Sequence, residues 1–226
     1  TKTYSDGTFG YCDWVELKNI SDSTLSLSGY YLSDSLKDLG KYALPDSTLA
    51  PGETFIILCG AESGTGANNL ASFSLDSSCE QLYLSRGEEI VDFAALRDIP
   101  YECSFGRMDG ENGWFYFAQP SPGKANTNGA RRVSAKPVNL TPDGVFDGVD
   151  SVTVELSGSG TVRYTLDGST PTERSPEYKE ALTISSTSVV KAVCFEEGAL
   201  PSRALVLSYI VNEGHSLPVV SLVSDS

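Results

Sequence analysis

Histidine, methionine and long apolar runs are nearly missing from this chain of 226 residues. It has one methionine and one histidine, His215, which lies close to the C-terminal end. Ser-His-Asp and Cys-His catalysis both need an imidazole as base, so neither arrangement can form before residue 215. No segment approaches the ~18 apolar residues of a membrane-spanning helix. We therefore expect no transmembrane segment in this chain.

Basic residues are also scarce. The chain has 16 Lys and Arg against 30 Asp and Glu, which gives a formal net charge of −14. Because nucleic-acid binding needs clustered cations to neutralise phosphates, this balance argues against a nucleic-acid partner. The one adjacent basic pair, Arg131 and Arg132, falls in a short polar stretch. We interpret the pair as a solvated hinge rather than as a phosphate contact.

Sequence motifs for cofactors and metals are missing as well. The chain has no P-loop, no glycine-rich kinase loop and no Asp-Phe-Gly. Asp143, Asp147 and Asp150 lack the spacing of an EF-hand, and their Asp-Gly steps are typical of turns. We expect no catalytic residues, no metal site and no cofactor.

The acidic residues do not by themselves indicate an enzyme. A glycosidase needs two carboxylates placed across a cleft, and a chain this acidic forms chance pairs easily. Asp34 and Asp38, with Lys37 between them, are interpreted as part of a solvated loop. We therefore expect a protein that is not an enzyme.

The five cysteines are odd in number, and none is spaced as Cys-x-x-Cys, which argues against a tetrahedral zinc site. We expect mostly buried thiols, because a reduced cysteine behaves as a small hydrophobe. A disulfide from Cys12 or Cys59 to Cys79 or Cys103 stays open as an alternative.

Helical periodicity is the last thing missing, and its absence favours an all-β chain. No window of eleven or more residues keeps a clean 3.6 period, whereas Gly, Pro, Ser, Thr, Val and Tyr are plentiful. Residues 11–19 show the strand pattern best, with Val15 and Leu17 on one face and Trp14 and Glu16 on the other.

Further strands are expected along the first half. The Pro51-Gly52 step predicts a type II turn closing a hairpin, and residues 54–59 read as a central strand. The other expected strands are 25–34, 41–45, 73–76, 80–85, 89–93, 101–107 and 114–117.

The second half repeats the strand pattern from residue 136 onward. Alternating apolar residues predict strands near 152–156, 162–166, 182–184, 190–194 and 205–209. On the 190–194 strand we expect Val190, Ala192 and Cys194 to face inward and Lys191 to face water.

Aromatic residues gather in the 114–117 segment. Trp114 and Tyr116 share one face of the expected strand, and Phe115 and Phe117 share the other. One pair should be buried, while the other is a candidate platform for a sugar or a partner. Trp114 and Tyr116 are the candidate ligand-binding residues.

The first half resembles the lamin tail domain over residues 1 to about 127. The resemblance rests on pieces that occur in the order of that family: residues 13–17, 27–30, 44–45 and 49–53, Asp92, residues 104–107 and 109–110, Trp114 and residues 120–126. It implies an immunoglobulin-like β-sandwich. Tyr30 stands where the family often has Trp.

Residues 136–212, after a linker at 128–135, resemble the C-terminal domain of chitobiase and β-hexosaminidase. The segment 162–172, Tyr178, residues 190–192 and Pro201-Ser202 carry this similarity. It implies a fibronectin-type-III-like sandwich that does not hold the glycosidase chemistry.

Residues 213–226 resemble the opening of a spore coat protein H family kinase domain, cut short. These resemblances together imply two β-sandwich domains in tandem, acting as noncatalytic structural or protein-interaction modules beside a kinase-like domain. They imply an extracellular or cell-surface location and a protein or cell-surface partner. The alternative is a carbohydrate-binding module that uses exposed aromatics.

Overall fold

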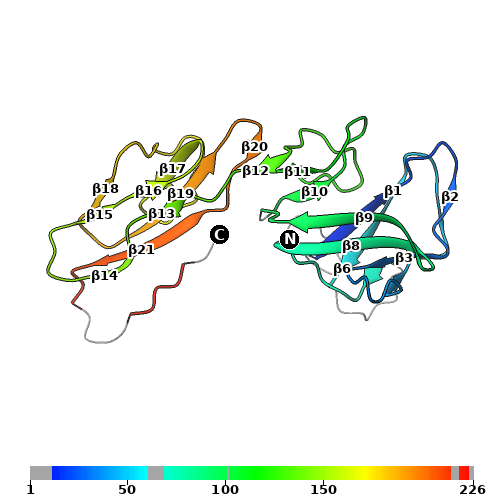
Figure 1. Ribbon diagram of the computed structural model, residues 1–226, viewed down its shortest axis with the longest axis horizontal. Coiled ribbons are helices and arrows are strands. Elements are labelled where there is room, and N and C mark those ends of the chain that lie inside the picture. The colour runs from blue at the N-terminus through cyan, green and yellow to red at the C-terminus, as the bar shows by residue number, and fades with distance from the viewer. Residues whose placement is uncertain (1–11, 61–68, 101, 215–218, 224–226) are drawn as a thin grey trace. The chain divides into compact units, whose positions relative to one another are not determined.

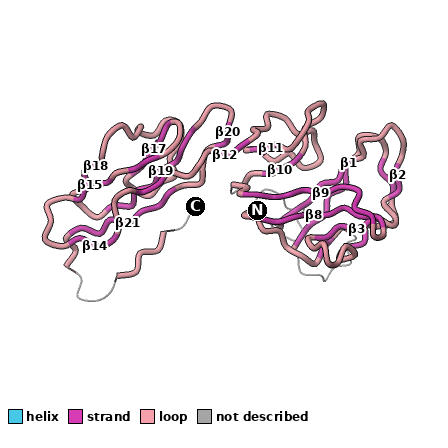
Figure 2. The backbone as a smooth tube through the Cα atoms, viewed as in Figure 1, coloured by secondary structure: helices cyan, strands magenta, loops and turns pink. Residues whose placement is uncertain are grey.

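A computed structural model describes residues 12–60, 69–100, 102–214 and 219–223, which form strands, turns and loops and no helix (Figures 1 and 2). The chain divides into two compact units, unit 1 (residues 1–129) and unit 2 (residues 130–226). The all-β prediction is confirmed.

Unit 1 is built from two main sheets. The strands are β1 (Asp13–Lys18), β2 (Leu25–Ser26), β3 (Tyr30–Ser33), β4 (Tyr42–Ala43), β5 (Thr48–Leu49), β6 (Thr54–Cys59), β7 (Leu70–Ala71), β8 (Cys79–Arg86), β9 (Glu89–Arg97), β10 (Ser104–Gly106) and β11 (Phe115–Phe117). One sheet has the order β4-β3-β8-β9 and the other β1-β6-β7, while β2-β5 and β10-β11 form small ladders.

One apolar core joins the two main sheets of unit 1. Leu32 and Leu82 enter it from the four-stranded sheet, and Ile57 and Cys59 enter it from the three-stranded sheet. Since each sheet contributes one face to a shared core, unit 1 is a β-sandwich. Val15 and Leu17 pack against this core, as the alternation in the first strand predicts.

The Pro51-Gly52 turn forms, but the hairpin predicted around it is wrong. Glu53 donates its N–H to the Ala50 carbonyl at 3.0 Å, and Gly52 has a φ of 77°, as a type II turn requires. However, β5 pairs with β2 and β6 pairs with β1. The turn therefore connects two different ladders. We attribute this to strand length, because β6 can pair along its whole length with β1, whereas β5 has only two residues.

The strand predicted at 73–76 is also wrong. These residues form a loop in which Phe73 is buried in the core, and the Leu75 N–H donates to the Asp13 carboxylate at 3.1 Å. A side chain thus takes the hydrogen bond that a strand partner would have supplied.

Unit 2 has a four-stranded sheet of order β14-β21-β19-β17, with the small ladders β15-β18, β13-β16 and β12-β20. The strands are β12 (Arg132–Val133), β13 (Val138–Asn139), β14 (Gly144–Phe146), β15 (Val152–Val154), β16 (Leu156–Ser157), β17 (Thr161–Thr165), β18 (Leu182–Ile184), β19 (Ser188–Phe195), β20 (Ala199–Leu200) and β21 (Leu205–Val211). Residues of β15, β16 and β18 share a core with β17, β19 and β21, so unit 2 is a second sandwich.

The central strand of unit 2, β19, is buried on both faces. Val190, Ala192 and Cys194 are fully buried, as predicted. Lys191 was expected to face water, and this is wrong, because its exposed fraction is 1%. Val193, on the same outward face, is 3% exposed. Alternation places Lys191 on the face opposite Val190, as predicted, but that face is also buried at Lys191 and Val193.

Part of the stretch expected as a linker, 128–135, is a strand of unit 2. Arg132 and Val133 pair in parallel with Ala199 and Leu200, and the division between the units falls after Gly129. In the C-terminal segment, His215 lies outside the described residues, and 219–223 form no strand.

Candidate functional site

The β10-β11 hairpin presents the aromatic residues singled out by the sequence. Phe105 pairs with Tyr116 across the ladder, so the two share a face with Trp114. Phe115 and Phe117 point the other way and are 3% and 2% exposed. Trp114 and Tyr116 are half-buried, as expected for the outer pair.

The outer aromatic residues pack on one another. The Phe105 and Trp114 rings are stacked, with centroids 5.2 Å apart and planes 11° apart. The Tyr116 ring lies 4.8 Å from Phe105, tilted by 50°. The Tyr116 hydroxyl donates a hydrogen bond to the Arg97 carbonyl at 3.0 Å, and burial raises the pKa of that phenol. We call Phe105, Trp114 and Tyr116 the aromatic cluster.

An ion pair completes the aromatic cluster. The Arg107 guanidinium lies over the Trp114 ring, 4.5 Å from its centroid, and donates to both Asp92 oxygens at 2.6 Å. These bonds raise the pKa of Arg107, because they favour its charged form. Asp92 also accepts the Phe93 N–H at 2.8 Å.

These contacts attach the hairpin to the outer edge of β9, the last strand of its sheet. The Asp98 N–H donates to the Ser78 carbonyl. From Asp92 to Asp98, before the bulge in the β8-β9 pairing, the backbone groups of even-numbered residues therefore face β8 and those of odd-numbered residues face the open edge. On that edge, Phe93 N–H is bonded to Asp92 and the Arg97 carbonyl to Tyr116. The side chains of Asp92 and of Tyr116, one member of the aromatic cluster, therefore occupy hydrogen-bonding groups on part of this edge strand.

Sequence reasoning found Trp114 and Tyr116 but did not connect them with Asp92, Phe105 and Arg107. The hairpin register was the available signal, because it places Phe105 opposite Tyr116. No local pattern indicates the Asp92–Arg107 pair, which spans 15 positions.

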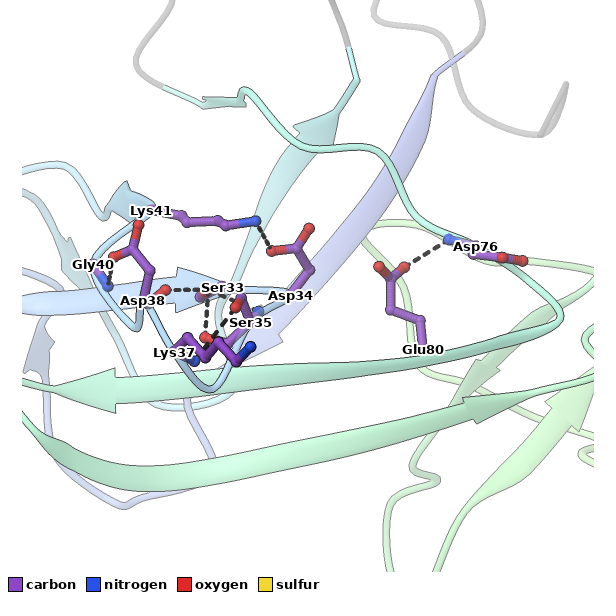
Figure 3. A network of polar contacts seen from close by, with 9 residues as sticks. All are labelled: Ser33, Asp34, Ser35, Lys37, Asp38, Gly40, Lys41, Asp76 and Glu80. Atoms are coloured by element: carbon purple, nitrogen blue, oxygen red, sulfur yellow. Dashed lines mark hydrogen bonds and ion pairs between the residues drawn. The ribbon is translucent and has the colours of Figure 1, made fainter.

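A second polar region lies at a depression of about 590 Å³ lined by Asp34, residues 72–77 and Glu80. Figure 3 shows that its polar groups bind one another. Lys41 forms an ion pair with Asp34 at 2.5 Å, and the Asp76 N–H donates to Glu80 at 2.6 Å. Burial, together with the charges of Asp34 and Asp76, raises the pKa of Glu80.

The interpretation of Asp34 and Asp38 as a solvated loop is wrong for Asp34. Its side chain is 15% exposed because it is held by Lys41. The Asp38 side chain accepts the Gly40 N–H, while its carbonyl accepts from the Ser33 hydroxyl at 2.6 Å (Figure 3). Both contacts shape the loop.

In the 143–150 stretch, Asp143 makes a contact that holds the fold. Asp143 accepts the Ser208 N–H at 3.3 Å, and Gly148 donates to the Asn212 side chain at 2.8 Å. Within the described ranges, no three His, Cys, Asp or Glu side chains are grouped so that they could hold a metal ion.

The expectation of mostly buried thiols is wrong. Cys59 and Cys194 are buried, whereas Cys103 is half-buried and Cys79 is exposed. These four are free thiols, so the alternative disulfides to Cys79 or Cys103 do not form. Cys79 is exposed because β8 begins with it, at the end of the sheet.

The fold defines a pair of immunoglobulin-like β-sandwich modules. Residues 1–96 match the family model of the Lamin Tail Domain, and residues 141–206 match that of the Chitobiase/beta-hexosaminidase C-terminal domain. The resemblances stated for residues 1–127 and 136–212 are confirmed, in the predicted order. Both are domains of the accessory rather than the catalytic type.

Comparison with curated proteins and with solved structures identifies no relative of this chain. In the part of the chain that the structure describes, no helix is long and apolar enough to cross a membrane.

Proposed function

We propose that the chain is a pair of noncatalytic structural or protein-interaction modules of an exported or cell-surface protein, accessory to a kinase domain of the spore coat protein H type. The two family matches support the accessory role. The kinase partner rests on the resemblance of residues 213–226, and the location rests on the family resemblances.

The observation that carries the structural role is the packing of the aromatic cluster. A sugar platform needs an aromatic face open to the ligand. Here Phe105 stacks on Trp114, Arg107 lies over the same ring, and the Tyr116 hydroxyl is bonded to β9. These side chains stabilise unit 1, with the exposed remainder of the module left for contact with a protein.

The test combines binding with stability. The full chain, Trp114→Ala and Tyr116→Ala are applied to a glycan array and to a cell-wall pull-down, and unfolding by urea is followed in parallel. We expect no glycan signal from the wild type and a lower unfolding midpoint for both variants. Phe93→Ala is the matched control, because its ring is 58% exposed and its loss should cost little stability.

The second candidate is a carbohydrate-binding module, favoured by the half-exposure of Trp114 and Tyr116. A wild-type glycan signal that Trp114→Ala abolishes while the fold is retained would establish it in place of the structural role. Turnover of a glycoside by the chain, lost on changing one carboxylate, would instead show an enzyme.

A further inference from the structure

The dibasic pair Arg131-Arg132 lies just after the boundary between the two units. Both side chains are exposed. On the unit 1 side, Gly129 is packed so closely that a Cβ there would lie 2.7 Å from Phe115 and Phe117 atoms. Ala130 forms an isolated β-bridge. Pairing with β20 in unit 2 begins at Arg132, the first residue of β12.

Arg132 is held to unit 2 through its backbone and its side chain. Its strand, β12, runs parallel to β20, and the Ser134 N–H donates to the Leu200 carbonyl at 2.9 Å. The guanidinium forms an ion pair with Glu196 and donates to the Glu197 carbonyl at 3.3 Å.

The carboxylate that receives Arg132 is itself held in place. The Glu196 side chain is 15% exposed, and the Ser159 hydroxyl donates to it at 2.5 Å. These two partners lower the pKa of Glu196, so it is charged at neutral pH. Arg132 therefore pairs with a carboxylate that a second hydrogen bond already holds in place.

Trypsin-like endoproteases bind an arginine side chain of the substrate in an acidic pocket and cut the peptide bond that follows it. They cut where exposed chain opens locally. The docked β12 has its backbone committed to β20, so cleavage requires the strand to detach first. Lys136, the next basic residue, precedes Pro137, which leaves Arg131 and Arg132 as the basic cleavage positions of this stretch.

We propose that Arg131-Arg132 is a processing site for a trypsin-like endoprotease, and that docking of β12 on β20 with the Arg132–Glu196 ion pair protects it. Hydrolysis adds water across the peptide bond after Arg131 or Arg132, leaving a carboxylate on one fragment and an amine on the other. The cut would separate unit 1 from unit 2, each with its own core.

The experiment is limited digestion of the folded full chain by trypsin, with fragments identified by intact mass. Glu196→Gln removes the charge that receives Arg132. Glu197→Gln is the matched control, since it makes the same change one position away and only the Glu197 carbonyl contacts Arg132. We expect fragments ending at residue 131 or 132 to form about 1.4- to 5-fold faster in Glu196→Gln, the range of a partly exposed ion pair.

Two further measurements separate protection from misfolding. Exchange of the Ser134 amide hydrogen should accelerate in Glu196→Gln and not in Glu197→Gln. A higher salt concentration should accelerate cleavage after Arg131 or Arg132 more in the wild type than in Glu196→Gln, because salt screens the ion pair. Cleavage of a short peptide at each salt concentration corrects for changes in the activity of trypsin itself. Equal junction rates in wild type and Glu196→Gln would overturn the proposal. Cleavage of the wild-type chain after Arg131 or Arg132 as fast as cleavage of the short peptide would also overturn it. A third contrary result is a Glu196→Gln chain that stays intact at these two positions while trypsin cuts it at other sites.

Discussion

Removing the Arg107 side chain tests whether the aromatic cluster supports unit 1. In Arg107→Ala the bidentate ion pair with Asp92 and the contact over the Trp114 ring are both lost. The side chains of Arg107 and Asp92 are 49% and 41% exposed, so solvent screens the pair and it falls within the range of surface ion pairs.

The expected loss follows from these two contacts. An exposed ion pair contributes ~0.2–1 kcal/mol, and a cation over an exposed aromatic ring ~0.5–1 kcal/mol. We therefore expect Arg107→Ala to lower the unfolding free energy of unit 1 by about 0.7–2 kcal/mol. Arg107→Lys keeps the charge but not the two parallel hydrogen bonds, so its loss should be smaller.

The assay is urea unfolding followed by tryptophan fluorescence. Trp14 and Trp114 both lie in unit 1, so the signal reports that unit alone. A double-mutant cycle with Asp92→Ala should give a coupling of about 0.2–1 kcal/mol. Arg163→Ala, in unit 2, is the control and should leave the fluorescence transition in place. A coupling of zero between Asp92 and Arg107 would refute the reasoning.

Three other changes have defined outcomes. Gly129→Ala should lower the stability of unit 1 by ~1–3 kcal/mol, because the new Cβ would lie 2.7 Å from the Phe117 ring; an unchanged fluorescence midpoint would contradict this packing. Glu80→Gln should stabilise unit 1 at pH 7, because the raised pKa means that the charged form is disfavoured on folding. That gain in stability should vanish at a pH below 4.5, the ordinary pKa of a glutamate. The urea midpoints of Glu80→Gln and the wild type, compared at pH 7 and at pH 4, would show this. Cys79 should react quickly with a thiol reagent at pH 8, whereas Cys59, with a pKa raised to about 12 by burial, should react only on unfolding; loss of the fast phase in Cys79→Ser would assign it.

Local pattern was sufficient for the class of fold and for many strands. The strand predicted over residues 11–19 contains β1 (Asp13–Lys18). The alternation of residues 114–117 correctly separated the buried Phe115 and Phe117 from Trp114 and Tyr116. These features depend on the period of two along a strand, which a sequence displays directly.

Features that depend on residues far apart in the sequence could not be predicted from local alternation. The turn at Pro51-Gly52 was predicted, but its flanking strands pair elsewhere. Lys191 was placed on the correct face, yet whether that face meets water depends on what packs over it.

The sequence by itself thus determined that this is an all-β chain with two sandwiches, which strand faces are apolar, and which aromatic residues stand apart. Only the tertiary structure decided that Asp92 and Arg107 hold Trp114 in place. It also decided that Arg132, although its side chain is exposed, is paired with Glu196 and belongs to a strand of unit 2. The physical reason is that alternation is a property of one strand, whereas burial, pairing and ion pairs are set by segments far apart along the chain.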